Sequence, residues 1–181
     1  MRPNLSIRMG ALADVNCLAA LATQVWLHTY ATDGISPAIA HYVSSEFNVS
    51  KFATILMQEK SAVLVAEVHG NTVGYALVNV DAPCLSGSST VEVVSLYVQA
   101  HFARRGIGAA LLRECQQVAH RRTGSAGIWL TVNAQNLPAI AFYAKHGMVK
   151  TGTAYFELGG ENHENHVMAS HEGSIVYNCY G

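Results

Sequence analysis

Two glycines and two arginines before an expected helix form the segment of this chain best suited to bind an anion. Arg104 and Arg105 precede Gly106 and Gly108 within the run SLYVQAHFARRGIG, residues 95–108. Glycine lets the backbone approach a ligand closely, and the free N–H groups of a first helical turn favour negative charge together with the helix dipole. The sequence therefore predicts a phosphate group held by backbone amides, with the arginines adding positive charge.

The same glycine pattern has a second interpretation. Gly-x-Gly before a helix also occurs where a helix packs tightly against a strand without any ligand. The segment is not a Walker loop, because no Gly-Lys-Ser/Thr follows, and the third glycine of the dinucleotide fingerprint is missing. The glycine loop alone therefore leaves phosphate binding and tight packing as open alternatives.

The composition is that of one globular domain over residues 1–181. Half of the residues are hydrophobic, 13% are charged and the net charge is −1, which excludes a disordered chain. No basic stripe is present, so we expect no nucleic-acid partner. The longest apolar run, residues 62–66, is too short to span a bilayer, and residues 1–4 carry no signal-peptide core. We therefore expect no membrane partner.

The four cysteines are scattered along the chain without paired spacing. This usage favours reduced thiols in a cytoplasmic protein over a disulfide framework or a zinc site. His163 and His166 lie in a polar loop that is expected to enter a strand, not on one helical face, so we expect no metal.

Hydrophobic periodicity and turn signals predict an α+β chain, with antiparallel strands first and a β-α-β-α-β order at the end. The expected helices are 15–30 capped by Asp14, a second from Ser36-Pro37, a third from Ser50 to about residue 60, a fourth after the glycine loop and a fifth from Leu137-Pro138 to Gly147. The expected strands are 5–9, 62–68, 73–80, 91–98, 127–132, 148–153, 154–158 and 166–170, with a hairpin turn at 69–72 and a loop at 81–90.

A second motif follows the strand expected at 127–132. It reads Asn136-x-x-Ala139-x-x-Phe142-Tyr143-x-x-x-Gly147. Together with the glycine loop, it resembles the GNAT superfamily of acyl-coenzyme-A N-acyltransferases, whose two motifs bind the cofactor's pyrophosphate and lie near its thiol end. The resemblance covers most of the chain. It implies the GNAT fold, an α/β/α sandwich with a mixed, mostly antiparallel sheet, and acetyl-CoA as co-substrate.

The resemblance also implies how the cofactor is held. Amides of the glycine loop would bind the pyrophosphate, and a bulged strand at 91–98 would pair its free edge with the pantetheine arm, leaving an N–H near Leu96 to polarise the acetyl carbonyl. Ala103 stands where the family often has Gln or Arg, so amides should carry more of the binding. The implied cofactor-binding residues are Leu96, Tyr97, Val98, Arg104, Arg105, Gly106, Ile107, Gly108, Ala109, Asn133, Asn136 and Tyr143.

Two side chains are candidates for proton transfer. Tyr143 stands where the family's tyrosine donates to the departing sulfur, a role that suits a phenol with a pKa near 10. Glu92, on the central strand, is the candidate base, acting directly or through a water. A Phe-Tyr pair on an amphipathic helix also fits simple packing, and Glu92 also fits a solvent-facing or salt-bridged carboxylate. These structural alternatives stay open.

The acceptor is expected to be a small-molecule amine. Segments at 42–48, 128–130 and 151–156 resemble bacterial polyamine N-acetyltransferases, which favours a primary amine such as spermidine. In the family the early helices form the substrate wall, and aromatic rings with carboxylates suit a cation, although Trp26 also suits the core. The candidate substrate-binding residues are Trp26, Tyr30, Asp33 and Glu46.

Several alternatives remain open. Within the class, the acceptor could be an amino acid, an aminoglycoside-like drug or a protein N-terminus. From other classes, the chain could be a non-catalytic acyl-CoA sensor on the same fold, or a phosphate-binding protein unrelated to coenzyme A. Exposed sheet ends near residues 154–170 could also pair two copies as a homodimer.

Overall fold

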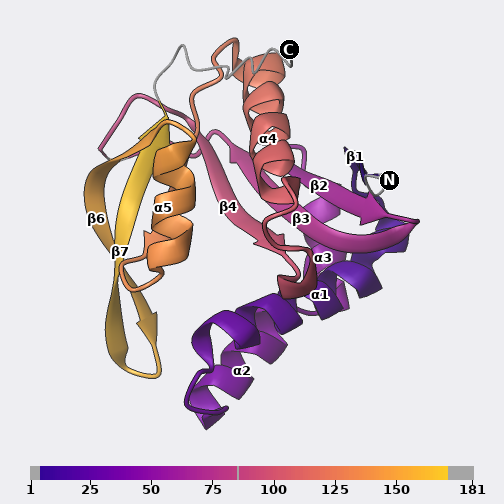
Figure 1. Ribbon diagram of the computed structural model, residues 1–181, viewed down its shortest axis with the longest axis vertical. Coiled ribbons are helices and arrows are strands. Elements are labelled where there is room, and N and C mark those ends of the chain that lie inside the picture. Colours follow the sequence, from indigo (N-terminus) through magenta and orange to yellow (C-terminus); the bar gives the residue numbers. More distant parts are fainter. Residues whose placement is uncertain (1–4, 85, 171–181) are drawn as a thin grey trace.

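The computed structural model of the protein describes residues 5–84 and 86–170. Within these residues, a seven-stranded sheet with the order β1-β2-β3-β4-β5-β7-β6 forms the middle layer (Figure 1). Neighbouring strands are antiparallel except β4 and β5, which run parallel. The predicted α+β sandwich with a mixed, mostly antiparallel sheet is confirmed.

The helices and strands follow one another in the predicted order, with differences at the third helix and the closing strands. The strands are β1 (Leu5–Met9), β2 (Ser61–Val68), β3 (Asn71–Val80), β4 (Val91–Val98), β5 (Trp129–Asn133), β6 (Met148–Leu158) and β7 (Glu161–Ser170). The helices are α1 (Val15–Tyr30), α2 (Pro37–Glu46), α3 (Val49–Met57), α4 (Ile107–Thr123) and α5 (Leu137–Lys145), with short 3-10 turns at Leu12–Asp14 and Ala100–Phe102. In the part of the chain that the structure describes, no helix combines the length and the apolarity needed to cross a membrane.

The sheet is covered on both faces by hydrophobic cores. On one face, α4 packs Leu111 and Cys115 against strand residues such as Leu64. On the other, α1 and α3 pack against Val65 and its neighbours, with Phe52 of α3 almost fully buried. Because successive strand residues point to opposite faces, the apolar run of β2 supplies both cores, as expected of a strand buried on both sides.

The third helix does not begin where the sequence prediction placed it. The side chain of Asn48 accepts a hydrogen bond from the N–H of Lys51 at 2.9 Å and caps the helix at Val49. The predicted cap, Ser50, therefore lies inside α3, and the helix ends at Met57 rather than near residue 60. Asn and Ser are both strong N-caps, so two candidates two residues apart could not be ranked from sequence.

The closing strands also differ from the prediction. Residues 148–158 form one strand instead of two, since a bulge between Lys150 and Gly152 lets pairing with β7 continue. β7 begins at Glu161 rather than at His166, so His163 lies in a strand instead of in the polar loop expected before it. Across residues 5–84 and 86–170, no three His, Cys, Asp or Glu side chains gather closely enough to hold a metal ion.

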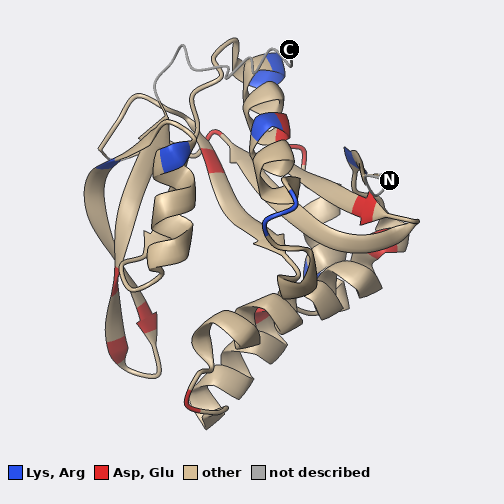
Figure 2. Cartoon of the chain, in the orientation of Figure 1, with Lys and Arg blue, Asp and Glu red and all other residues tan. Residues whose placement is uncertain are grey.

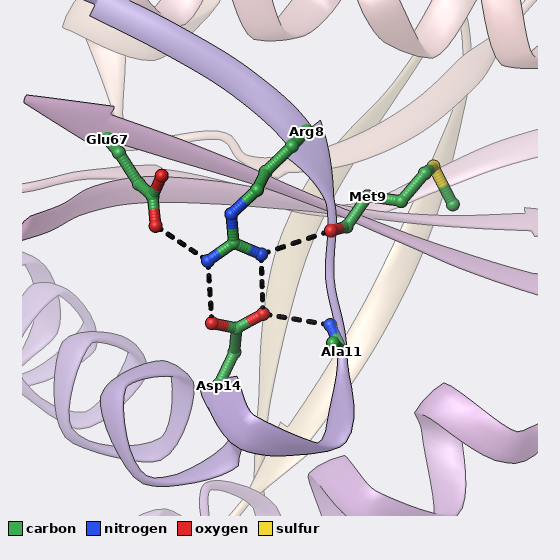
Figure 3. Close-up of polar contacts among 5 residues, drawn as sticks. All are labelled: Arg8, Met9, Ala11, Asp14 and Glu67. Carbon is green, nitrogen blue, oxygen red and sulfur yellow. Dashed lines mark hydrogen bonds and ion pairs between the residues drawn. The ribbon is translucent and has the colours of Figure 1, made fainter. Parts of the chain in front are cut away.

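The guanidinium of Arg8 joins the first strand to the start of α1 (Figure 3). It donates two hydrogen bonds of 2.8 Å to the Asp14 carboxylate and one of 2.6 Å to Glu67 of β2. Asp14 also accepts a hydrogen bond from the N–H of Ala11 at 2.8 Å. Asp14 does stand at the predicted N-cap position, but its carboxylate makes no capping bond to α1, because Arg8 and Ala11 occupy it. Hydrogen bonding to Arg8, chiefly, holds the pKa of Asp14 below its ordinary value.

We expect Asp14→Ala to lower the free energy of unfolding by about 2 kcal/mol, because it removes the charged hydrogen bonds between Arg8 and Asp14 and leaves Glu67 as the carboxylate partner of Arg8. A carboxylate whose pKa is lowered by folding adds stability above its unfolded pKa and loses it as the pH falls through the folded one. The difference between wild type and variant should therefore shrink below about pH 4. Urea unfolding at a series of pH values measures both effects.

The matched control is Lys60→Ala, which removes an exposed ion pair of 3.0 Å with Asp81. Its effect should stay below about 0.5 kcal/mol, because exposed pairs contribute little. An Asp14→Ala loss as small as that of the control would show that the Arg8 network does not stabilise the fold.

Candidate active site

β4 separates from its neighbour β5 soon after it begins. Glu92 and Trp129 are the one register pair recorded between these strands in the described residues. Beyond this pair, β4 and the β7–β6 pair spread apart (Figure 1). β4 also carries the bulge that the family resemblance implied, because Ser95 and Val93 face consecutive residues of β3 and leave Val94 as an extra residue. The backbone of β4 after the bulge thus has an edge toward β5 that no strand occupies.

The helix α4 begins beside this open edge. Gly106 takes a left-handed φ of 83°, and a Cβ placed on it would meet nothing within 4 Å. No side chain caps α4, so the N–H groups of its first turn point outward from the helix end. Arg104 and Arg105 lie in the loop directly before the helix, and this loop is blue in Figure 2. The Arg105 guanidinium carbon stands over the ring of Phe102, 5.1 Å from the ring centre.

The second glycine has a different environment. A Cβ on Gly108 would lie 3.3 Å from Cζ of Phe142 in α5 and 3.8 Å from Cδ2 of Leu96 in β4. Gly108 therefore allows α4, α5 and β4 to approach closely. The packing interpretation fits Gly108, whereas Gly106 leaves open space at the helix end, and phosphate binding there stays a prediction.

Tyr143 of α5 belongs to the core on the α4 side of the sheet, together with Cys115 and Leu111 of α4. It is buried, and burial is the main reason that the pKa of its hydroxyl is raised well above the ordinary value, with smaller contributions from Cys115 and Tyr30. The helix that carries it is capped as predicted, because the side chain of Asn136 accepts a hydrogen bond from the N–H of Ala139 at 3.2 Å. Tyr143 is thus a rigidly held neutral phenol.

Tyr30, at the end of α1, comes close to this phenol. Burial raises the pKa of Tyr30, and the side chain of Asn136 opposes that shift. Tyr30 also contributes to the raised pKa of Tyr143. The structure therefore brings one predicted substrate residue together with two predicted cofactor residues. Asn133 lies nearby at the end of β5, where its side chain accepts a hydrogen bond from the N–H of Gln135 at 2.8 Å.

An aromatic cluster covers the sheet face on the side of α1 and α2. The ring of Trp26 lies 5.1 Å from Tyr30 and 4.9 Å from Tyr42, between ring centres. Tyr42 in turn reaches Phe156 of β6 at 5.4 Å. Trp26 is only 5% exposed, so its ring serves the core as well as this cluster.

Phe47 extends the cluster to the bulged strand. Its ring centre lies 6.4 Å from that of Tyr97 on β4, and 5.8 Å from that of Tyr42. Tyr42, Phe47 and Phe156 were not among the predicted site residues. The segments that resemble polyamine acetyltransferases, 42–48 and 151–156, contain all three and were the available signal.

The three predicted carboxylates, Glu92, Glu46 and Asp33, differ in their burial and in their distance from the open edge of β4. Glu92 is half-buried at the point where β4 and β5 part, and burial raises the pKa of its carboxyl. Glu46 ends α2 and forms an exposed ion pair of 2.7 Å with Lys51. Asp33 is exposed in the link between α1 and α2. Glu92 alone among them lies next to the open edge of β4.

Comparison with known proteins identifies the family. Residues 25–148 match the acetyltransferase (GNAT) family. An uncharacterized N-acetyltransferase of Mycobacterium tuberculosis is 30% identical over 157 residues, which are 87% of this chain and 97% of the relative. A spermidine N(1)-acetyltransferase of Thermoplasma acidophilum is 22% identical over 148 residues, 80% of this chain and 88% of the relative. The PaiA N-acetyltransferase of Thermoplasma acidophilum, solved with coenzyme A, has a TM-score of 0.77 at 20% identity, over 92% of this chain and 98% of that one.

The chain belongs to the acetyltransferase (GNAT) family, and it is an enzyme of the acyltransferase class. The family match includes the glycine loop and all of α5, the segments on which the sequence resemblance rested. The similarity to the solved structure confirms the GNAT fold.

The different environments of the loop residues predict different effects on cofactor binding. We expect Gly108→Val to raise the KM for acetyl-CoA about tenfold or more, because the added methyl groups displace Phe142 and separate α4 from α5. Arg104→Ala should raise it less than about threefold, since it removes one exposed charge. Steady-state kinetics at a saturating amine concentration measures both KM values. A larger effect for Arg104→Ala would contradict the expectation that the glycines matter more than the arginine side chain for cofactor binding.

Proposed function

We propose that the protein transfers the acetyl group of acetyl-CoA to a primary amine, directly within a ternary complex. The observation that carries the proposal is the position of Tyr143, a buried phenol in the core that also contains Ile107 of the first turn of α4 and Val93 of β4. The family membership and the coenzyme A bound to the similar PaiA structure support acetyl-CoA as the co-substrate.

In this proposal the cofactor lies along the open edge of β4. Backbone amides of residues 104–109 bind the pyrophosphate, since anions favour a helix N-terminus and Gly106 leaves room there. The backbone groups of Leu96, Tyr97 and Val98 that face this edge pair with the pantetheine arm as an additional strand would. Asn133 and Asn136 contact the cofactor from the turn that leads into α5.

Two side chains then carry out the proton transfers, Tyr143 as the acid and Glu92 as the base. The amine attacks the thioester carbonyl, a C–N bond forms, and the C–S bond breaks from the tetrahedral intermediate. A backbone N–H near Leu96 stabilises the oxyanion. Tyr143 donates its proton to the departing sulfur, and Glu92 accepts the proton lost by the amine, directly or through a water. The products are the acetylated amine and coenzyme A.

The acceptor that we propose first is a polyamine such as spermidine. The aromatic cluster of Trp26, Tyr30, Tyr42, Phe47 and Phe156 suits a cation through ring faces, with Glu46 at the end of α2. The distant spermidine acetyltransferase relative supports the same choice. We also propose a cytoplasmic location, in which the free thiols of Cys17, Cys84 and Cys115 stay reduced.

The proposal is tested by following thiol release from acetyl-CoA with a panel of amines. The panel contains spermidine, amino acids, an aminoglycoside and a peptide with a free N-terminus. Turnover with any of them supports the enzyme, and spermidine giving the highest kcat/KM supports the polyamine. Tight acetyl-CoA binding without turnover on the whole panel would instead favour an acyl-CoA sensor.

We expect Tyr143→Phe to lower kcat about 100-fold or more, because the thiolate then leaves without a positioned acid. The affinity for acetyl-CoA should stay the same, since only the hydroxyl is lost. Calorimetric binding and thiol release measure the two quantities. Tyr155→Phe, on a residue of β6 that is 70% exposed, is the control and should behave as wild type. Unchanged turnover in Tyr143→Phe would remove this phenol from the mechanism.

A pH profile tests Glu92. Burial raises the pKa of this carboxyl, and a base works only when deprotonated. The kcat/KM should therefore rise with pH through an apparent pKa above that of an ordinary glutamate, and fall on acidification. Glu92→Gln should lower kcat/KM and remove this rise of kcat/KM with pH. Glu161→Gln, at an exposed position of β7, should keep the rise. A rise of kcat/KM with pH that persists in Glu92→Gln would show that another group titrates.

A further inference from the structure

Asn165 of β7 holds a buried polar atom that has no partner. Its side-chain Oδ1 is shielded from solvent and accepts no hydrogen bond, and no other side-chain nitrogen or oxygen of residues 5–84 and 86–170 is recorded in that state. Leaving a buried acceptor unpaired is energetically costly, so an isolated case in a native fold calls for an explanation. A ligand that supplies the missing donor is one such explanation.

The strand register places Asn165 on the sheet face that carries the aromatic cluster. Asn165 pairs with Ala154 of β6, and Phe156 follows Ala154 by two residues without an intervening bulge. Residues two apart on a strand, and residues directly opposite across a pair, share a face. Asn165 therefore shares its face with Phe156, whose ring contacts Tyr42 of α2.

The same face carries Glu92, the proposed base. Asn165 pairs with Asn133 of β5, and Asn133 is four residues from Trp129, the partner of Glu92 in β4. All four side chains consequently lie on one face. The N–H of Ala134 donates a 2.9 Å hydrogen bond to the carbonyl of Glu164, so β7 is fixed to the turn that leads to Asn136.

From this placement we infer that Asn165 binds the acceptor amine. Its Oδ1 accepts a hydrogen bond from an N–H of the acceptor and orients that molecule between the aromatic cluster and the cofactor turn at Asn133. Because Oδ1 has almost no accessible surface in this structure, the acceptor must displace the groups that cover it when it binds. The inference rests on the proposed function, since it assigns an acceptor contact to that reaction.

The test compares Asn165→Leu with wild type, using the amine that the panel shows to be acetylated, spermidine first. We expect the KM for the amine to rise about tenfold, which corresponds to one lost hydrogen bond to a charged donor. The KM for acetyl-CoA should not change, and the melting temperature should not fall, because the substitution removes an unpaired polar atom. Asn162→Leu, at an exposed position of the same strand, is the matched control and should leave all three values unchanged.

Two results would overturn the inference. An unchanged KM for the amine in Asn165→Leu would show that the amide does not contact the acceptor. A lower melting temperature, with both KM values raised together, would assign Asn165 a structural role, and Asn165→Ala distinguishes loss of the amide from a poorly fitting leucine. Failure of the proposed function is recognised separately, because wild type would then acetylate none of the amines.

Discussion

The single register pair between β4 and β5 is the constraint on which the rest of the site depends. Glu92 and Trp129 join the two strands at one position, and the bulge at Val94 then turns β4 away. A continuous sheet would have satisfied the β4 backbone and left no room for a cofactor. Because the parallel pairing stops, backbone donors and acceptors remain free at the centre of the fold, where the helix ends of α4 and α5 can face them.

The two parts of the sheet are held at this opening by helices rather than by strand pairing. Phe142 of α5 packs against Gly108 of α4 on one side. On the other side, Tyr42 of α2 contacts Phe156 of β6, so rings from distant segments connect the early helices to the last hairpin. Both contacts join side chains that also lie next to proposed functional groups. Packing and function therefore share the same residues, and a change in one affects the other.

Much of the fold could be predicted from the sequence, because it depends on local periodicity. The strand at 91–98 and the helix at 15–30 were predicted with their observed bounds, since apolar spacing and turn residues specify them. Boundaries decided by one side-chain bond were harder. Asn48 and Ser50 both fit a helix cap, and only the folded chain shows which of them binds a backbone N–H.

The residues of the candidate site that belong to a sequence motif could be predicted. Those that meet only through tertiary contacts could not. Gly106 and Tyr143 belong to motifs with fixed spacing, so they could be selected from the sequence. Phe47 and Phe156 are ordinary apolar residues until folding places them on one sheet face. Asn165 gave no signal, because an unpaired amide is recognised only after every neighbouring donor has been placed.

The strand order has a consequence for biosynthesis. The first four strands pair in the order in which they leave the ribosome, but β7 is inserted between β5 and β6. β5, which leads into the turn before Tyr143, therefore keeps an unpaired edge until residues 161–170 have been synthesised. The C-terminal part of the sheet is thus completed last, and a chain that ends within the final hairpin would keep an unpaired edge on β5.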